Sequence, residues 1–321
     1  MSISAVTIEN LTSVATLIFV LGILGARLKS DVRIPDSIYQ MISIFLLFGI
    51  GLKGGHALKE TSFDSIIKPV FGTLFLGVLI PILAFLTLKL IKNINDLDRG
   101  AIAAHYGSTS LVTFLAALLF LENSGIKVEG SATALLTIME IPGIVVGVYL
   151  GARHTKKDVQ WGKTMHEVIT GKTILLLVGG LVIGAITSAA GYQKVSPFFI
   201  DLQFGLLTLF LLHLGYLAGS RWSEIRRVGL SVGIFAIVFP IFAGTLGVIV
   251  GHFAGLSVGG ATMLGVLSAS ASYIAAPAAV SIGIPEANGG LALMSSIGVT
   301  FPFNLIIGIP LYLEIALALF G

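Results

Sequence analysis

The sequence predicts an all-α membrane protein whose ten transmembrane helices form a 5+5 inverted repeat, with helices 4 and 9 broken. Three observations lead to this prediction. The 321 residues are 55% hydrophobic and 11% charged, with a mean hydropathy of +1.00, which is too apolar for an ordinary soluble domain. The chain also divides into ten apolar runs. Two of these runs are interrupted by hydroxyl side chains at equivalent places in the two halves.

The ten runs define the expected helices. They cover residues 10–26, 37–58, 69–91, 100–121, 131–152, 173–190, 198–219, 229–252, 258–283 and 290–320. Most of them approach or exceed the roughly 20 residues that a helix needs to cross about 30 Å of hydrocarbon. None alternates polar and apolar residues as a transmembrane β-strand does.

Basic residues are distributed unequally between the two sides of the membrane. If all ten runs cross, fourteen of the 19 Lys and Arg lie in loops on one side, and four lie on the other, with Lys53 inside a run. The positive-inside rule makes the first side cytoplasmic. We therefore expect a multi-pass protein of the inner (plasma) membrane with both termini non-cytoplasmic. The net charge of +3 then reflects topology and does not indicate nucleic-acid binding.

The chain divides into two five-helix repeats. Residues 1–152 form the first, 153–172 a polar cytoplasmic linker, and 173–321 the second. Segments 100–142 and 260–302 match at an offset of 160, which pairs Ser108 with Ser268 and Pro142 with Pro302. Because five spans, an odd number, separate equivalent residues, the second copy enters the membrane from the opposite side.

Hydroxyl clusters interrupt the fourth and ninth runs. They read H-Y-G-S-T-S-L-V-T over residues 105–113 and S-A-S-A-S-Y-I-A-A-P over residues 268–277. Glycine, proline and N-capping serines all favour a break in a helix. At a rise of 1.5 Å per residue, Ser108 lies roughly 13 Å into a hydrocarbon core about 30 Å thick. Ser268 reaches a similar depth from the opposite face, so both breaks are expected near the midplane.

Half-helices that begin at the midplane direct unpaired N–H groups and a partial positive charge toward the centre of the protein. This arrangement predicts an anion site that needs no Lys or Arg. The expected anion-binding residues are Gly107, Ser108, Thr109, Ser110, Thr113, Ser268, Ser270, Ser272 and Tyr273. In the structural alternative, these serines bond to carbonyls of their own helices or join neighbouring helices.

Glu140 is the strongest single candidate for cation or proton coupling. It lies in the middle of the fifth run, where an acid is costly unless it pairs, protonates or binds a cation. Its repeat counterpart is Thr300, with Asn304 one turn later. We expect these three residues to serve sodium or proton coupling. The structural alternative for Glu140 is a hydrogen bond to a neighbouring helix.

Several kinds of chemistry have no motif in this chain. The six histidines lack the spacing of zinc ligands, and we find no phosphate loop and no nucleophile elbow. The absence of cysteine excludes disulfides. We therefore expect no catalytic residues, no structural or catalytic metal and no cofactor, with sodium only as a coupling ion.

The motifs resemble those of the sodium-dependent bicarbonate transporter family. The resembling stretches include I-P-D-S-I at 34–38, G-I-G-L-K-G-G at 49–55, L-E-N-S-G-I at 121–126, E-I-P-G-I-V at 140–145 and G-I-P-E-A-N at 283–288, together with both hydroxyl clusters. The resemblance implies a homotrimer that carries bicarbonate and sodium by an elevator motion, and a small cytoplasmic PII-like regulator. Tyr273 and Glu140 stand where the family usually has aspartates.

The expected function is a sodium-coupled secondary active symporter of a small inorganic anion, with bicarbonate as the resemblance implies. A sodium-coupled organic-anion symporter of the bile-acid type and a sodium/proton antiporter are alternatives. A further alternative, from a different class, is a membrane sensor or scaffold that binds an ion without transporting it. An enzyme is not expected.

Overall fold

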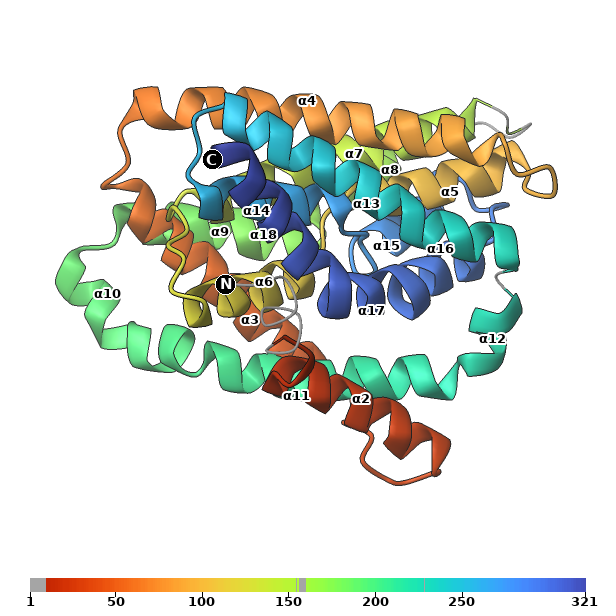
Figure 1. Cartoon of the computed structure of the whole chain (residues 1–321), viewed down its shortest axis with the longest axis horizontal. Coiled ribbons are helices and arrows are strands. Elements are labelled where there is room, and N and C mark those ends of the chain that lie inside the picture. Colours follow the sequence, from red (N-terminus) through yellow and green to blue (C-terminus); the bar gives the residue numbers. More distant parts are fainter. Residues whose placement is uncertain (1–9, 154, 156–159, 228) are drawn as a thin grey trace.

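The computed structural model describes residues 10–153, 155, 160–227 and 229–321, and every regular element within them is a helix (Figure 1). The first half contains α2 (Val14–Arg27), α3 (Asp36–Leu58), α4 (Phe63–Leu88), α5 (Asp96–Gly107), α6 (Leu111–Asn123) and α7 (Ala132–Ala152). The second half contains α8 (Trp161–Thr170), α9 (Lys172–Ile186), α10 (Ala189–Ser196), π-helix η1 (Pro197–Asp201), α11 (Gln203–Ser220), α12 (Trp222–Arg227), α13 (Leu230–Phe253), α14 (Val258–Ala269), α15 (Ala276–Gly283), α16 (Gly289–Ser295), π-helix η2 (Ser296–Thr300), α17 (Phe301–Phe303), π-helix η3 (Asn304–Gly308) and α18 (Ile309–Phe320).

The chain is a multi-pass membrane protein. Within the described residues, seven helical segments are long and apolar enough to cross a bilayer, and an eighth is obtained if α8 and α9, which meet at a bend of 48°, form one span. Two further apolar helices, α2 and α14, are shorter than a full span. The predicted helical class is confirmed, and each predicted run falls on helix. The arrangement of ten spans as two inverted repeats of five stays a prediction.

The helices pack in two groups. In one group, α2 lies against α11 and α3 lies against α9; in the other, α4, α5 and α7 pack together, as do α13, α14 and α18. Figure 1 shows α2 and α11 at the lower edge of the view and α4 along the upper edge, with α13 crossing the view below α4. Helix α6 contacts α11 of the first group and η3 of the second, so it lies between the groups.

Small residues allow the helices to approach closely, as is common in membranes. A Cβ atom on Gly22 of α2 would lie 2.2 Å from the carbonyl oxygen of Leu212 on α11. A Cβ on Gly143 of α7 would lie 1.8 Å from the carbonyl oxygen of Gly107, the last residue of α5. Any larger residue at Gly143 would therefore displace the end of α5, where the fourth predicted helix is broken.

The predicted linker, residues 153–172, contains regular structure. Helix α8 occupies Trp161–Thr170 and packs against α15 and α7, whereas residues 154 and 156–159 lie outside the described residues. Gly171 separates α8 from α9. The polar composition of this segment favoured a loop, but the buried Thr164 and Val168 give α8 a face that packs on the bundle.

Candidate functional site

Both predicted interruptions are present. Helix α5 ends at Gly107 and α6 begins at Leu111, and Ser108 and Ser110 between them have extended backbones. Helix α14 ends at Ala269, and α15 begins only at Ala276. Each interruption thus opens a short stretch of backbone inside the helical bundle, where its polar groups need partners.

The two interruptions meet in space. The backbone N–H of Ser110 donates to the hydroxyl of Ser270 at 3.0 Å, and the hydroxyl of Ser110 donates to that of Tyr273 at 3.2 Å. The N–H of Ser272 donates to the carbonyl oxygen of His105 at 2.8 Å. All seven predicted Ser and Thr residues of the two clusters are buried. The structure therefore brings together segments that are about 160 residues apart in the chain.

Serine side chains cap the half-helices that leave the breaks. The hydroxyl of Ser110 accepts the N–H of Thr113 at 3.2 Å and the hydroxyl of Thr113 at 3.0 Å at the start of α6. The hydroxyl of Ser272 accepts the N–H groups of Ala275 and Ala276, each at 3.3 Å, at the start of α15. These bonds satisfy some of the free N–H groups at each helix start. Some of the N–H groups predicted to bind an anion are thus already hydrogen-bonded within the protein.

Glu140 holds the first break. Its Oε2 accepts the N–H of Thr109 at 3.2 Å and also the hydroxyl of Thr109. The side chain is 2% exposed, and no Lys or Arg among the described residues forms an ion pair with it. A buried carboxylate without a basic partner is costly unless it is protonated or binds a cation. Oxygen atoms of Glu140 and Thr109 are hard ligands of the kind that suit a sodium ion.

Thr300 and Asn304 belong to separate networks. The hydroxyls of Thr300 and Tyr106 lie 2.6 Å apart, and Thr300 donates to the carbonyl oxygen of Ala236 at 2.7 Å. The amide of Asn304 donates to the carbonyl oxygen of Ala269 at 2.8 Å and accepts the hydroxyl of Tyr312 at 3.1 Å. No hydrogen bond between described residues joins either side chain to Glu140, and a coupling role for the three residues stays a prediction.

The networks nevertheless act at equivalent backbone positions. Glu140 accepts from Thr109, which lies inside the first break, and Asn304 donates to Ala269, the last residue of α14 before the second break. Thr109 and Ala269 are 160 residues apart. One break is held through its N–H group and the other through its carbonyl. The acid is therefore present at one break only, and the second break is held by a neutral amide.

Two buried hydroxyls make no hydrogen bond of normal geometry within the described part of the chain. They are the Oγ atoms of Ser108 and Ser268, and the Ser108 hydroxyl lies near the carboxylate of Glu140. A buried polar group without a partner costs about 1–3 kcal/mol. A ligand that accepts from either hydroxyl would recover part of that cost. By contrast, the hydroxyl of Ser270 is used twice, because it also donates to the carbonyl oxygen of Leu267 at 2.8 Å.

A narrow cleft lies between the breaks and the neighbouring helix α9. Thr109, Ser110, Leu111, Leu136, Glu140, Thr173, Leu177, Ser272, Tyr273 and Ile274 line it. The cleft measures about 10 Å³, roughly the space of one water molecule. Sequence reasoning missed Thr173, because this residue begins the sixth predicted run and looked like the polar edge of a span. An ion larger than a water molecule does not fit in this cleft.

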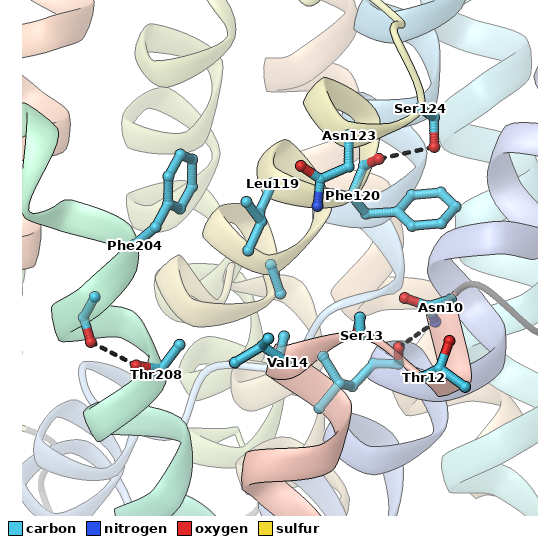
Figure 2. Close-up of a pocket in the computed structure, with 14 residues that line it drawn as sticks. Asn10, Thr12, Ser13, Val14, Leu119, Phe120, Asn123, Ser124, Phe204 and Thr208 are labelled. Atoms are coloured by element: carbon cyan, nitrogen blue, oxygen red, sulfur yellow. Dashed lines mark hydrogen bonds between the residues drawn. The ribbon is translucent and has the colours of Figure 1, made fainter.

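A larger cavity of about 560 Å³ lies away from the breaks, between α2, α6, α11 and η3 (Figure 2). Its lining is mostly apolar, with Leu119, Phe120 and Phe204 from α6 and α11. Asn10 lies at one edge and donates to the carbonyl oxygens of Leu305 and Ile306 at 2.8 and 2.9 Å. The low polarity of this cavity makes it unsuited to a hydrated inorganic anion.

The comparisons with known proteins agree with the resemblance found in the motifs. The sequence model of the Na⁺-dependent bicarbonate transporter superfamily matches residues 15–317. A search of curated proteins produced no match. Because the family match covers nearly the whole chain, including both breaks and Glu140, this protein belongs to the Na⁺-dependent bicarbonate transporter superfamily.

Proposed function

We propose that this protein is a sodium-coupled secondary active symporter of a small inorganic anion, bicarbonate, and that the two helix breaks hold the anion. The observation that carries the proposal is that two breaks are hydrogen-bonded to each other and that the buried hydroxyls of Ser108 and Ser268 beside them make no hydrogen bond of normal geometry within the described residues. Hydroxyl donors and the N-terminal ends of α6 and α15 favour an anion without any Lys or Arg. Family membership supports bicarbonate as that anion.

Glu140 is the proposed coupling residue. A sodium ion bound by the Glu140 carboxylate and the Thr109 hydroxyl would neutralise the buried acid and reduce the electrostatic cost of bringing an anion to the same region. Sodium would then raise the affinity for bicarbonate, and bicarbonate would raise the affinity for sodium by the same factor. Thr300 and Asn304 would act by shaping the second break.

The proposed movement is an elevator motion. The group that contains α4, α5, α7, α13, α14 and α18 would carry the breaks past the group formed by α2, α3, α9 and α11. The contribution of Thr173 and Leu177 from α9 to the cleft supports this division, because the cleft lies where the two groups meet. Sliding along this boundary would open the cleft to one side of the membrane at a time.

The proposal also includes the assembly and topology that the sequence predicts. These are ten spans in a 5+5 inverted repeat, non-cytoplasmic termini, an inner-membrane location, a homotrimer and regulation by a small cytoplasmic PII-like protein. The hydrogen bond between Ser110 and Ser270, which the sequence match pairs as equivalent residues, supports the repeat. The unequal distribution of basic residues supports the orientation.

The test is uptake of labelled bicarbonate into proteoliposomes under an inward sodium gradient. We expect this uptake to disappear when potassium replaces sodium. We also expect sulfate, acetate and taurocholate to inhibit it only weakly. Strong competition by taurocholate would instead indicate an organic-anion symporter. Sodium movement coupled to an opposite proton flux would indicate an antiporter, and sodium-dependent bicarbonate binding without any flux would indicate a sensor.

A further inference from the structure

A groove of about 440 Å³ lies between the end of α4 and the first half of α13. Figure 1 shows the end of α4 and the start of α13 at the right of the view. It is lined by Thr87, Leu90, Ile91, Ser231, Ile234, Phe235, Val238, Phe239 and Phe242. Phe235 and Phe239 form a buried floor with their rings stacked at 4.9 Å, whereas Val238 on the rim is 57% exposed. The groove is thus an apolar channel with an aromatic floor on two membrane-spanning helices.

The dimensions of the groove match one leaflet of a bilayer. Ser231 lies at the start of α13, beside the end of α4, and Phe242 lies near the middle of α13. At 1.5 Å per residue the groove extends for about 16 Å along the helix. The hydrocarbon of one leaflet is about 15 Å thick, half of a 30 Å core. An acyl chain lying along α13 would therefore fill the groove from the interface to the midplane.

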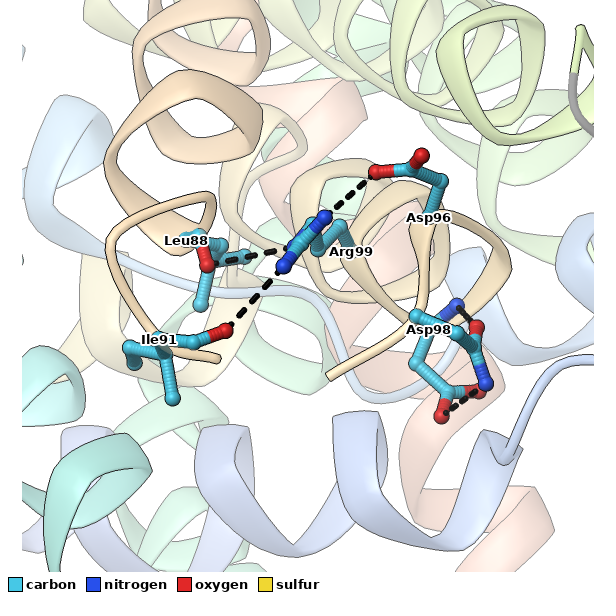
Figure 3. Close-up of polar contacts among 6 residues, drawn as sticks. Leu88, Ile91, Asp96, Asp98 and Arg99 are labelled. Carbon is cyan, nitrogen blue, oxygen red and sulfur yellow. Dashed lines mark hydrogen bonds and ion pairs between the residues drawn. The ribbon is translucent and has the colours of Figure 1, made fainter. Parts of the chain in front are cut away.

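The end of the groove at the membrane surface carries unpaired positive charge. Lys89 and Lys92 are both exposed, directly beside Leu90 and Ile91, and neither takes part in an ion pair between described residues. The nearby Arg99 is used differently, as Figure 3 shows: it donates to the carbonyl oxygens of Leu88 and Ile91 and pairs with Asp96 at 2.6 Å. Lys89 lies over the ring of Phe85 at 5.2 Å, and the two lysines have no acidic partner among the described residues, so their charges are available to an external anionic group.

We propose that this groove, here named the α4–α13 groove, binds an anionic phospholipid. One acyl chain lies on Phe235 and Phe239, and the phosphate headgroup lies beside Lys89 and Lys92. The charge at the mouth and the apolar channel below it match the two parts of such a lipid. This inference goes beyond transport and does not depend on the proposed substrate.

The groove also adjoins the candidate site. The ring of Tyr106 lies 5.1 Å from Phe235 and 6.0 Å from Phe239, both in edge-to-face geometry. Tyr106 directly precedes Gly107, the last residue before the first break, and its hydroxyl bonds to Thr300. A lipid chain on the aromatic floor therefore supports the helix end that carries the break.

The test compares lipids added to the purified, delipidated protein. Thermal unfolding and native mass spectrometry are measured with phosphatidylglycerol, phosphatidylcholine and glycerol 3-phosphate. We expect phosphatidylglycerol to raise the midpoint temperature most, phosphatidylcholine less, and glycerol 3-phosphate not at all. Equal effects of glycerol 3-phosphate and phosphatidylglycerol would overturn the proposal in favour of a simple anion site.

Two variants locate the effect. Val238→Trp fills the groove from its exposed rim and should abolish the stabilisation by both lipids, whereas Val182→Trp, at a 53% exposed position on α9, should not. Lys89→Gln with Lys92→Gln should weaken phosphatidylglycerol binding about tenfold or more and leave phosphatidylcholine unchanged.

Three results would contradict the assignment. Identical lipid responses of Val238→Trp and Val182→Trp would place the lipid elsewhere. Lys89 and Lys92 are exposed, so replacing them should not impair folding. If the double lysine variant binds phosphatidylglycerol with unchanged affinity, the two lysines do not form the headgroup site. A change of oligomer size in Val238→Trp alone would identify the groove as a contact between copies of the chain. None of these readouts uses bicarbonate uptake, so they are independent of the proposed transport function.

Discussion

The backbone N–H of Ser110 donates to the hydroxyl of Ser270 at 3.0 Å, and these two serines are 160 residues apart, the same offset that relates the two halves of the sequence. Residues that the sequence match pairs therefore touch inside the bundle. This contact is what the predicted inverted repeat requires of two paired residues that lie near the axis relating its halves. The breaks consequently form one shared polar region, and residues on both sides of it can contact the same small ion.

Ser108→Ala and Ser268→Ala should each raise the KM for bicarbonate about tenfold, because each removes a hydroxyl donor to a charged ligand. Thermal stability should change little, since neither hydroxyl makes a hydrogen bond of normal geometry within the described residues. Initial uptake rates in proteoliposomes measure the first effect, and a thermal melt measures the second. Ser281→Ala, an exposed serine of α15 that bonds only to Ala278, is the matched control. An unaltered KM in both site variants would exclude their hydroxyls from the anion site.

Glu140→Gln should abolish activation by sodium while preserving the fold. The glutamine amide oxygen can still accept the N–H of Thr109, but it has no charge with which to hold a cation. The measurement is bicarbonate uptake as a function of sodium concentration. Glu122→Gln, which removes the half-exposed partner of Lys53, is the control and should retain sodium activation. A normal sodium response in Glu140→Gln would mean that sodium binds elsewhere.

Ser110→Ala should lower the free energy of unfolding by about 1 kcal/mol through loss of the N-cap of α6. It should also reduce uptake, because the same hydroxyl donates to Tyr273 across the breaks. Ser188→Ala removes a comparable cap from the exposed helix α10 and should affect stability alone. Chemical denaturation and uptake measured on the same preparations separate the two effects. If Ser110→Ala and Ser188→Ala take up bicarbonate equally well, Ser110 acts only as a structural cap.

Gly143→Ala should destabilise the protein by about 3 kcal/mol or more, because the new methyl group overlaps the carbonyl of Gly107 and overpacking of a tight core is costly. Gly233→Ala, on α13, meets nothing within 4 Å and should be neutral or stabilising by up to about 1 kcal/mol. The midpoint of thermal unfolding is the measurement. If Gly143→Ala melts at the wild-type temperature, the close contact between α5 and α7 is not required.

The location of the breaks could be predicted from the sequence because local chemistry determines it. Gly107 ends α5, and Ser110 and Ser272 cap the helices that follow. Their meeting could be predicted as well, because the sequence match at an offset of 160 pairs the two hydroxyl clusters at similar predicted depths. These features depend on residue type and spacing, which the sequence contains directly.

Other features depend on contacts between distant helices, which no local pattern contains. Thr173 reaches the cleft because α9 packs beside the breaks, although it begins a predicted run. Asn304 bonds to Ala269 and Tyr312 instead of joining Glu140, in a region where π-helices η2 and η3 flank Pro302. A π-helix shifts the register of the side chains that follow it, so α-helical spacing alone does not show which groups Asn304 contacts.

The most direct test of the shared site is sodium-driven uptake of labelled bicarbonate by the double variant Ser108→Ala with Ser268→Ala, measured beside the wild-type protein in proteoliposomes at equal protein content. The account predicts sodium-dependent uptake by the wild-type protein and near-background uptake by the double variant, with both proteins unfolding at similar temperatures. Wild-type rates and sodium dependence in the double variant would contradict it.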